Sequence, residues 1–170
     1  MFRQVNLPGG IPGTLFLHSM PGRYEPLGQF NSEIKRLGVK RIICLAPIEE
    51  IRKKSGQYFQ AIQTGELPCE REPFEVQDFQ APEDREGFVK LVKAVASRLE
   101  ADERILVHCA GGVGRTGTFA ACVLLFLGIG LDEALTTISQ SGSRPETEKQ
   151  VELVQWVADR FQATSEGKGN

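Results

Sequence analysis

Short runs of aliphatic and aromatic residues alternate along the chain with stretches in which apolar positions recur at helical spacing. The short runs predict buried strands at residues 14–18, 41–46 and 104–108, with a brief extended piece at 74–76. The helical spacing predicts helices at residues 29–37, 86–99, 118–126, 132–140 and 146–161. Turn residues such as Gly38 and Pro145 mark some of the boundaries.

This alternation of strands and helices predicts an α/β fold with a central, largely parallel sheet flanked by helices. No internal repeat and no long proline, serine or single-charge tract occurs within residues 1–161. We therefore expect one domain over residues 1–162 and a flexible tail over residues 163–170. With 170 residues and 41% hydrophobic content, the chain can bury a full core without disulfides or metals.

Charge and cysteine content narrow the functional classes. The formal net charge of −2 gives no electrostatic footprint for nucleic acid or an anionic membrane, so neither is an expected partner. The longest apolar stretch, residues 119–131, is too short and too interrupted by glycine to cross a bilayer. The four cysteines form no CxxC pair and no signal-peptide pattern opens the sequence, which indicates reduced thiols and a cytoplasmic location. We expect a monomer with no bound metal or cofactor.

A glycine-rich span joins the predicted strand at 104–108 to the next buried helix and reads His108-Cys109-Ala110-Gly111-Gly112-Val113-Gly114-Arg115-Thr116-Gly117. It should lie at a helix N-terminus, beyond the carboxyl end of a parallel strand, where such sheets bind ligands. Unpaired N–H groups and the helix dipole at that end favour an anion and push a thiol toward thiolate. Cysteines in such positions can have pKa values of about 3.5–7.5. Cys109 is thus the candidate nucleophile.

Other residues of the span predict how it binds an anion. Arg115 can donate two parallel hydrogen bonds to phosphate oxygens. The backbone amides that can surround the remaining oxygens are those of Ala110, Gly111, Gly112, Val113 and Gly114. Thr116 is placed to donate a hydrogen bond to the thiolate, and His108 can support the loop through its ring nitrogens. A mononucleotide-binding loop would need glycine in place of Cys109 and lysine in place of Arg115. The expected ligand is therefore a phosphate group, but not that of a mononucleotide bound in such a loop.

The span matches the signature HC-x5-R-[ST]-G, and on that ground the chain resembles the protein tyrosine phosphatase superfamily. The resemblance implies that Cys109 is the nucleophile and Arg115 the phosphate clamp. Members carry a general-acid aspartate on a movable loop about thirty residues before the cysteine, and Asp78 in Gln77-Asp78-Phe79-Gln80-Ala81-Pro82 matches it. The stretch Glu146-Thr147-Glu148-Lys149-Gln150 resembles the late glutamine loop, which implies that Gln150 positions the hydrolytic water. Glu146 stands where tyrosine-specific members carry a first glutamine.

The whole layout resembles small dual-specificity phosphatases of the kinase-associated phosphatase type. This resemblance implies a protein phosphatase that hydrolyses phosphotyrosine, and also phosphoserine or phosphothreonine, through a phosphocysteine intermediate, with a phosphorylated protein as partner. A phosphoinositide or RNA 5′-phosphatase on the same scaffold is an alternative, although such relatives usually carry lysines in the loop or a basic rim. A second alternative is a module that binds a phosphorylated ligand without cleaving it, although such a module would need neither Cys109 nor Asp78.

Four further residues each have two interpretations. Cys44, on a predicted central strand, is either an ordinary buried cysteine or the partner of Cys109 in a reversible disulfide of the kind that some relatives use. Arg23, Tyr24 and Arg144 are either solvated surface residues or part of a substrate groove.

Overall fold

The computed structural model describes residues 1–166 of the chain. Its strands are β1 (Arg3–Gln4), β2 (Thr14–His18), β3 (Arg41–Cys44), β4 (Glu70–Pro73) and β5 (Arg104–His108). Its helices are α1 (Leu27–Leu37), α2 (Ile48–Lys54), α3 (Gly56–Thr64), α4 (Arg85–Glu100), α5 (Gly114–Phe126), α6 (Leu131–Gln140) and α7 (Glu148–Glu166).

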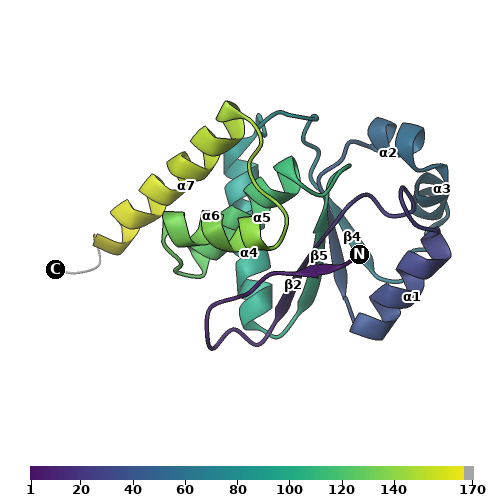
Figure 1. The fold of residues 1–170 in the computed structure, drawn as a ribbon, viewed down its shortest axis with the longest axis horizontal. Helices are drawn as coiled ribbons and strands as arrows, with labels where there is room; N and C mark the ends of the chain where they lie inside the picture. Colours follow the sequence, from purple (N-terminus) through teal and green to yellow (C-terminus); the bar gives the residue numbers. More distant parts are fainter. Residues whose placement is uncertain (167–170) are drawn as a thin grey trace.

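The strands form one five-stranded sheet in the order β1-β2-β5-β3-β4. Strand β1 is antiparallel to β2, and all other neighbours run parallel. Helices cover both faces of the sheet, with α1, α2 and α3 on one side and α4 to α7 on the other (Figure 1). The expected α/β fold with a largely parallel, helix-flanked sheet is therefore confirmed. Within residues 1–166, no helix combines the length and the apolar content needed to cross a bilayer.

Some expected element boundaries are wrong. The extended piece expected at 74–76 is preceded by the actual strand, β4, whose sequence Glu-Arg-Glu-Pro is polar because it forms a sheet edge. The helix expected at 118–126 begins earlier, at Gly114, and the strand expected at 41–46 ends at Cys44. Helix α7 continues to Glu166, past the helix end expected at 161, because no glycine or proline interrupts the chain before Gly167. The rest of the expected tail, 167–170, lies outside the described residues. The apolar pattern also does not reveal β1, α2 or α3, which are short and rich in polar residues.

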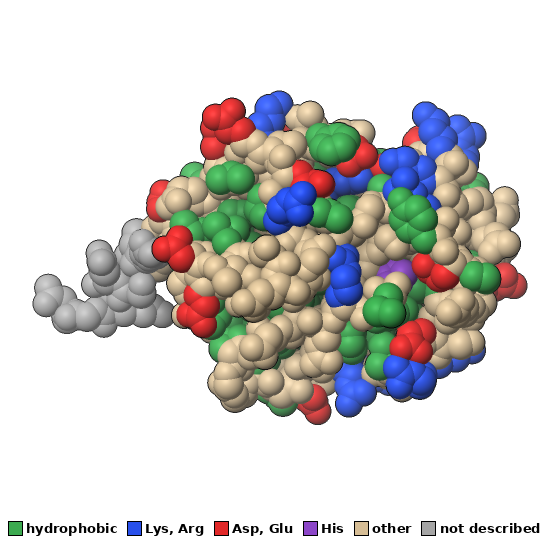
Figure 2. Space-filling model, in the orientation of Figure 1, with side chains coloured by type: hydrophobic (Ala, Val, Ile, Leu, Met, Phe, Trp, Pro, Cys, Tyr) green, Lys and Arg blue, Asp and Glu red, His purple; other side chains and the backbone are tan. Residues whose placement is uncertain are grey.

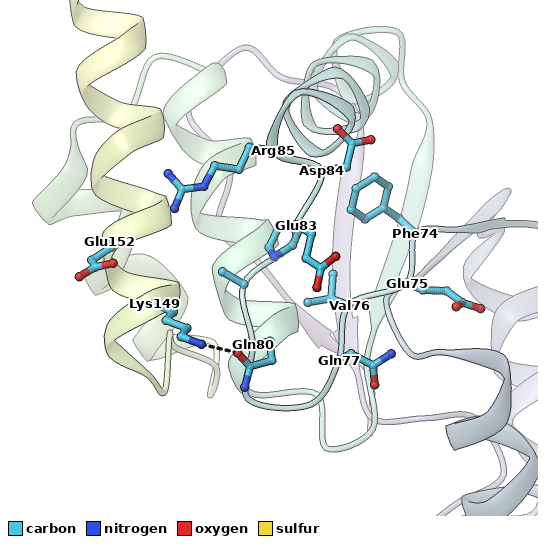
Figure 3. A pocket seen from close by; sticks show the side chains of 12 residues that line it. Phe74, Glu75, Val76, Gln77, Gln80, Glu83, Asp84, Arg85, Lys149 and Glu152 are labelled. Carbon is cyan, nitrogen blue, oxygen red and sulfur yellow. Dashed lines mark hydrogen bonds between the residues drawn. The ribbon is translucent and has the colours of Figure 1, made fainter.

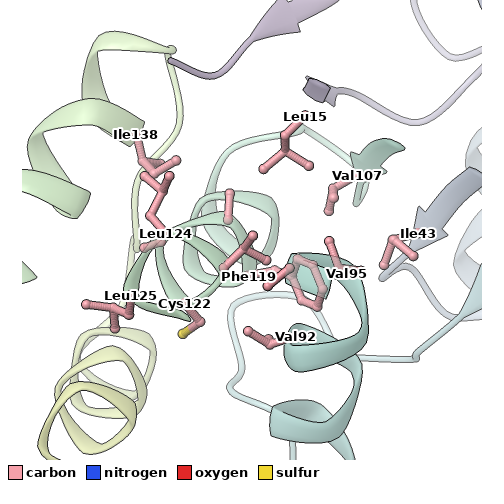
Figure 4. Close-up of a cluster of buried hydrophobic side chains, with 14 of the residues drawn as sticks. Leu15, Ile43, Val92, Val95, Val107, Phe119, Cys122, Leu124, Leu125 and Ile138 are labelled. Atoms are coloured by element: carbon pink, nitrogen blue, oxygen red, sulfur yellow. The ribbon is translucent and has the colours of Figure 1, made fainter. Parts of the chain in front are cut away.

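Alternation along the strands sorts side chains into two packed layers. Leu15, Ile43 and Val107 point to one face and pack with α4 to α7 in the largest buried cluster (Figure 4). Phe16, Ile42 and Leu106 point to the other face and pack against α1. Helix α5 lies inside the large cluster, and each of its residues from 114 to 125 is buried. Packing on all sides therefore fixes the N-terminus of α5 at the carboxyl ends of the parallel strands.

Two buried histidines stand side by side at these carboxyl ends. His18 of β2 is the register partner of His108 of β5, and their exposed fractions are 1% and 0%. Burial lowers the pKa of each ring from 6.5 to about 4. Both rings are therefore neutral at pH 7.

This burial predicts a pH dependence of stability. The unfolded chain takes up both protons near pH 6.5, whereas the folded chain resists protonation down to about pH 4. The free energy of unfolding should have its full histidine contribution above pH 6.5 and lose about 3 kcal/mol per histidine as the pH falls to about 4. Urea unfolding at stepped pH measures this decline. It should be shallower in His18→Gln than in the wild-type chain, and equal slopes would contradict the assignment.

Candidate active site

Residues Cys109 to Gly114 form a tight loop between β5 and α5. The Gly112 amide donates a hydrogen bond to Cys109 Sγ at 3.2 Å, and Cys109 is only 3% exposed. Gly112 has φ +74°, and a side chain there would collide with the His18 carbonyl oxygen, so only glycine fits. Helix α5 begins at Gly114, which places Arg115 and Thr116 in its first turn. The sulfur therefore lies at the positive end of a buried helix, as expected.

His108 supports this loop from below. Its Nδ1 lies 2.9 Å from the Cys109 carbonyl oxygen, and its Nε2 lies 3.0 Å from the Tyr58 hydroxyl. A carbonyl can only accept, so Nδ1 carries the proton and Nε2 of the neutral ring accepts from Tyr58. His108 thus joins the loop to α3, and both of its ring nitrogens are engaged in hydrogen bonds outside the pocket.

The Arg115 guanidinium is held by three acceptors from two other segments. Its Nη1 donates to Glu50 Oε2 at 2.7 Å and to the Val76 carbonyl oxygen at 2.9 Å. Its Nη2 donates to Glu50 Oε1 at 3.2 Å and to Asp78 Oδ1 at 2.9 Å. The Nε atom is buried and, within residues 1–166, has no acceptor. One donor of the clamp is therefore free for a ligand oxygen.

Glu50, which the sequence patterns do not single out, is the main partner of Arg115. It lies on α2 one turn before Lys54, whose Nζ contacts Glu50 Oε1 at 2.5 Å and Asp78 Oδ2 at 3.6 Å. Burial acts to raise the pKa of the Glu50 carboxyl, but hydrogen bonds from Arg115 and Lys54 outweigh burial and lower the pKa. Glu50 is therefore ionised and balances the buried guanidinium.

The loop that carries Asp78, residues 74–84 (the acid loop), is bonded to the start of α7. Lys149 Nζ donates to Gln80 Oε1 at 2.8 Å, as Figure 3 shows, and Gln150 Nε2 donates to the Gln80 carbonyl oxygen at 3.2 Å. The Gln150 Oε1 accepts from the Glu146 amide at 2.8 Å. Gln150 is 1% exposed, so its amide braces the acid loop in this structure. Gln80 and Lys149 also line a larger hollow of about 700 Å³ between this loop and α7 (Figure 3).

A pocket of about 240 Å³ opens above Cys109. It brings together Asp78, Gln150 and the predicted residues of the loop except Gly112. Its full lining is Arg23, Tyr24, Lys54, Asp78, Phe79, Cys109, Ala110, Gly111, Val113, Gly114, Arg115, Glu146 and Gln150. Basic side chains gather over α2 beside it (Figure 2). The pocket therefore combines a buried thiol, an arginine clamp, a carboxylic acid and a helix N-terminus, a set suited to binding and cleaving a phosphate ester.

Some predicted contacts are not found. Thr116 Oγ1 is buried and makes no hydrogen bond within the described part of the chain, so the expected bond to the sulfur is absent and the Gly112 amide makes it instead. Cys44 and Cys109 are both free thiols, and Cys44 instead contacts Arg71 Nη2 at 3.5 Å. Arg144 does not line the pocket, whereas Arg23 and Tyr24 do.

Comparison with known proteins identifies the family. The family described as "Swiss Army Knife protein, DSP-PTPase phosphatase domain" matches residues 11–167. The chain belongs to this DSP-PTPase family. Membership confirms the resemblance carried by the Cys109–Arg115 span. Within this domain, Tyrosine-protein phosphatase 69D of Drosophila melanogaster is 47% identical over 45 residues, which are 26% of this chain and 3% of that protein.

Solved structures share the fold of this DSP-PTPase domain at low sequence identity. A structure of kinase associated phosphatase, with its catalytic-site cysteine replaced by serine, has a TM-score of 0.80 at 20% identity and covers 96% of each chain. The active form of Tk-PTP has a TM-score of 0.70 at 23% identity and covers 88% of this chain and 95% of its own. PTPMT1 has a TM-score of 0.75 at 15% identity and covers 99% of this chain and 100% of its own.

The Glu50 contact predicts a measurable role for α2. In Glu50→Gln, the buried guanidinium of Arg115 loses its charge partner and shifts toward Asp78, so the DSP-PTPase domain should bind inorganic phosphate about tenfold more weakly. Titration calorimetry measures this affinity. Glu49→Gln is the matched control, because Glu49 is exposed and pairs with Arg52 at the surface. Equal affinities in the two variants would contradict the role of Glu50.

The Gln150 brace makes a separate prediction. Removing its amide in Gln150→Ala should speed hydrogen exchange of the Gln80 amide, which bonds to the Gln77 carbonyl oxygen, by roughly fivefold. Gln155→Ala is the control, because Gln155 lies on the exposed side of α7 and its side chain donates to Asp159 on the same helix. If the acid loop exchanges at the wild-type rate in Gln150→Ala, Gln150 does not brace it.

Proposed function

We propose that this DSP-PTPase domain is a cysteine-dependent phosphatase that cleaves phosphate monoesters of proteins through a phosphocysteine intermediate. The observation that carries the proposal is the meeting of Cys109, Arg115 and Asp78 around one pocket at the N-terminus of α5. A nucleophile, an anion clamp and a proton donor are the groups that such a reaction requires.

Substrate binding uses the donors that the loop leaves open. One phosphate oxygen accepts a hydrogen bond from the free Nε–H of Arg115. A second phosphate oxygen replaces Asp78 as the acceptor of the Arg115 Nη2 hydrogen bond. The remaining charge lies against the loop amides and the first turn of α5. Binding therefore releases Asp78 from Arg115 and frees its carboxyl to turn toward the leaving group. Glu50 and Val76 keep Nη1, so the clamp stays in place during this exchange.

Phosphoryl transfer then proceeds in two steps. The Cys109 thiolate attacks phosphorus, and the bond from phosphorus to the leaving oxygen breaks. Asp78, which takes up a proton from solvent when phosphate displaces it from Arg115, gives that proton to the leaving oxygen. In the second step Asp78 takes a proton from water, the water oxygen attacks phosphorus, and the bond from phosphorus to sulfur breaks to release phosphate. The Gly112 amide, which donates to Cys109 Sγ, is the donor available to the departing thiolate. Gln150 borders the same pocket and can hold the attacking water.

The pocket rim favours a phosphotyrosine side chain. Tyr24 and Phe79 both line the pocket, yet their exposed fractions are 66% and 58%, which is unusual for large aromatic residues. Two exposed rings at the mouth can pack against the ring of a phosphotyrosine while its phosphate reaches Cys109. The span from Ala110 to Gly114 carries no lysine, so the loop itself adds no charge for a multiply phosphorylated headgroup. We therefore propose phosphoprotein, with phosphotyrosine first, as the substrate class.

Activity on a generic aryl phosphate tests the mechanism. Wild-type protein should hydrolyse p-nitrophenyl phosphate in the presence of a metal chelator, and Cys109→Ser should lose activity by at least about a thousandfold. Asp78→Asn should lower kcat by roughly a hundredfold while the KM changes little, because the substituted residue no longer donates a proton. Turnover that survives in Cys109→Ser would exclude the phosphocysteine route.

A substrate panel tests the specificity. Phosphotyrosine peptides should be cleaved with a kcat/KM at least about tenfold above phosphothreonine peptides, and Phe79→Ala should reduce this ratio because one of the two rings is lost. Vesicles that carry phosphatidylinositol 5-phosphate form the third arm, since PTPMT1 has a solved structure in complex with PI(5)P. A preference for the lipid, in which Arg23 and Lys54 at the rim would take part, would overturn the protein-substrate assignment.

A further inference from the structure

The outer side of the phosphate-binding loop is held by a residue from the far end of the sequence. Arg3, on the short edge strand β1, donates through Nη2 to the Gly112 carbonyl oxygen at 2.5 Å. Its Nη1 donates to Ser143 Oγ at 3.1 Å and to the carbonyl oxygens of Ser141 and Gly142. Ser143 Oγ in turn donates to the same Gly112 oxygen at 2.6 Å. The Gly112 carbonyl thus accepts two hydrogen bonds on the side away from the pocket.

This arrangement fixes the orientation of two peptide groups. The Gly112 amide points to Cys109 Sγ, while the Gly112 carbonyl points to Arg3 and Ser143. In a trans peptide the carbonyl and the following N–H point in opposite directions, and no cis peptide is present in the described residues. The Val113 N–H is therefore directed away from Arg3, toward the pocket that Val113 lines. If the Gly112 carbonyl turned inward, its oxygen would face the phosphate.

Arg3 also places a positive charge behind the nucleophile. Its guanidinium is about half-buried, which lowers its pKa, whereas the neighbouring Cys109 sulfur acts to raise it. Arg115 lies across the pocket and the α5 N-terminus lies at its floor, and Arg3 adds a third source of positive potential from the opposite side of the loop.

Attachment of β1 to the sheet does not by itself require all the hydrogen bonds that the Arg3 side chain makes. The strand pairs with β2 through only two residues, Arg3 with Leu17 and Gln4 with Phe16. Carbonyl oxygens of Ser141 and Gly142 alone would anchor the Arg3 side chain to the α6–α7 connection. The Arg3 guanidinium in addition uses its other terminal nitrogen, Nη2, to donate to the Gly112 carbonyl oxygen of the phosphate-binding loop.

We propose that Arg3 is a positioning residue for catalysis: through the Gly112 carbonyl it holds the loop amides toward the phosphate. This inference rests on the phosphatase function proposed above. Ser143, which is uncharged, donates a second hydrogen bond to the same Gly112 oxygen and supports it in the same orientation.

Substitutions at Arg3 and Ser143 test this role. Arg3→Met should lower kcat/KM for p-nitrophenyl phosphate by roughly tenfold or more and weaken binding of inorganic phosphate about as much. Arg3→Lys retains a donor but not the fork, so it should restore only part of the phosphate affinity. Ser143→Ala removes the second hydrogen bond to the Gly112 oxygen and should also weaken phosphate binding.

Gln4→Ala is the matched control, because Gln4 shares β1 with Arg3 and should leave every readout at its wild-type value. Thermal unfolding of each variant is recorded beside the other assays, because a merely structural role would lower the Tm of Arg3→Met and leave the phosphate affinity of the folded protein unchanged. A wild-type protein without phosphatase activity would refute the proposed function. An active wild-type protein together with an Arg3→Met variant that keeps its phosphate affinity would refute the role of Arg3 alone.

Discussion

A guanidinium buried inside a protein must be neutralised, and the Arg115 side chain is 2% exposed. Its counter-charges come from Glu50 on α2 and Asp78 on the loop after β4, with the Val76 carbonyl as a third acceptor. Two segments that are far apart in the sequence, α2 and the loop after β4, therefore converge on this side chain of α5. Arg115 is the group around which the side chains of the pocket are assembled.

The loop between β5 and α5 is held from three directions. His108 fixes its base through the Cys109 carbonyl, Arg3 and Ser143 fix its outer side through the Gly112 carbonyl, and burial of α5 fixes its far end. On the inner side, the Gly112 amide donates to the Cys109 sulfur. The supporting side chains bond to carbonyl oxygens of the loop and therefore do not occupy its other amide groups. Rigid support on the outside therefore accompanies open hydrogen-bonding capacity on the inside, which is what an anion site needs before its ligand arrives.

The signature span could be predicted because its chemistry is contiguous: Cys109 and Arg115 are six positions apart and lie between two strongly apolar segments. Asp78 followed from family spacing, since local sequence does not distinguish it from Glu75 or Glu83. Glu50 could not be found this way, because it sits in a run of charges with Glu49, Arg52 and Lys53 that is typical of a solvated helix. Only the packing of Ile51 into the core shows which glutamate turns inward.

The same limit applies to the edges of the sheet. The central strands β2, β3 and β5 are buried and apolar, so their hydrophobicity marks them, whereas the edge strands β1 and β4 are short and polar. Arg3 lies on one of these edges, and its role depends on a contact across more than a hundred residues that no local pattern encodes. Thr116 is the converse case, since its adjacency to the loop predicts a bond that the fold does not form.

The ties between Gln80 and the start of α7 have a consequence for how the acid loop moves. Lys149 and Gln150 hold that loop from a helix whose other side packs on α5, the helix that positions Arg115. A displacement of α7 along its own axis would therefore alter the acid and the phosphate clamp together. The position of Asp78 is then coupled to the C-terminal helix through the contacts of Gln80.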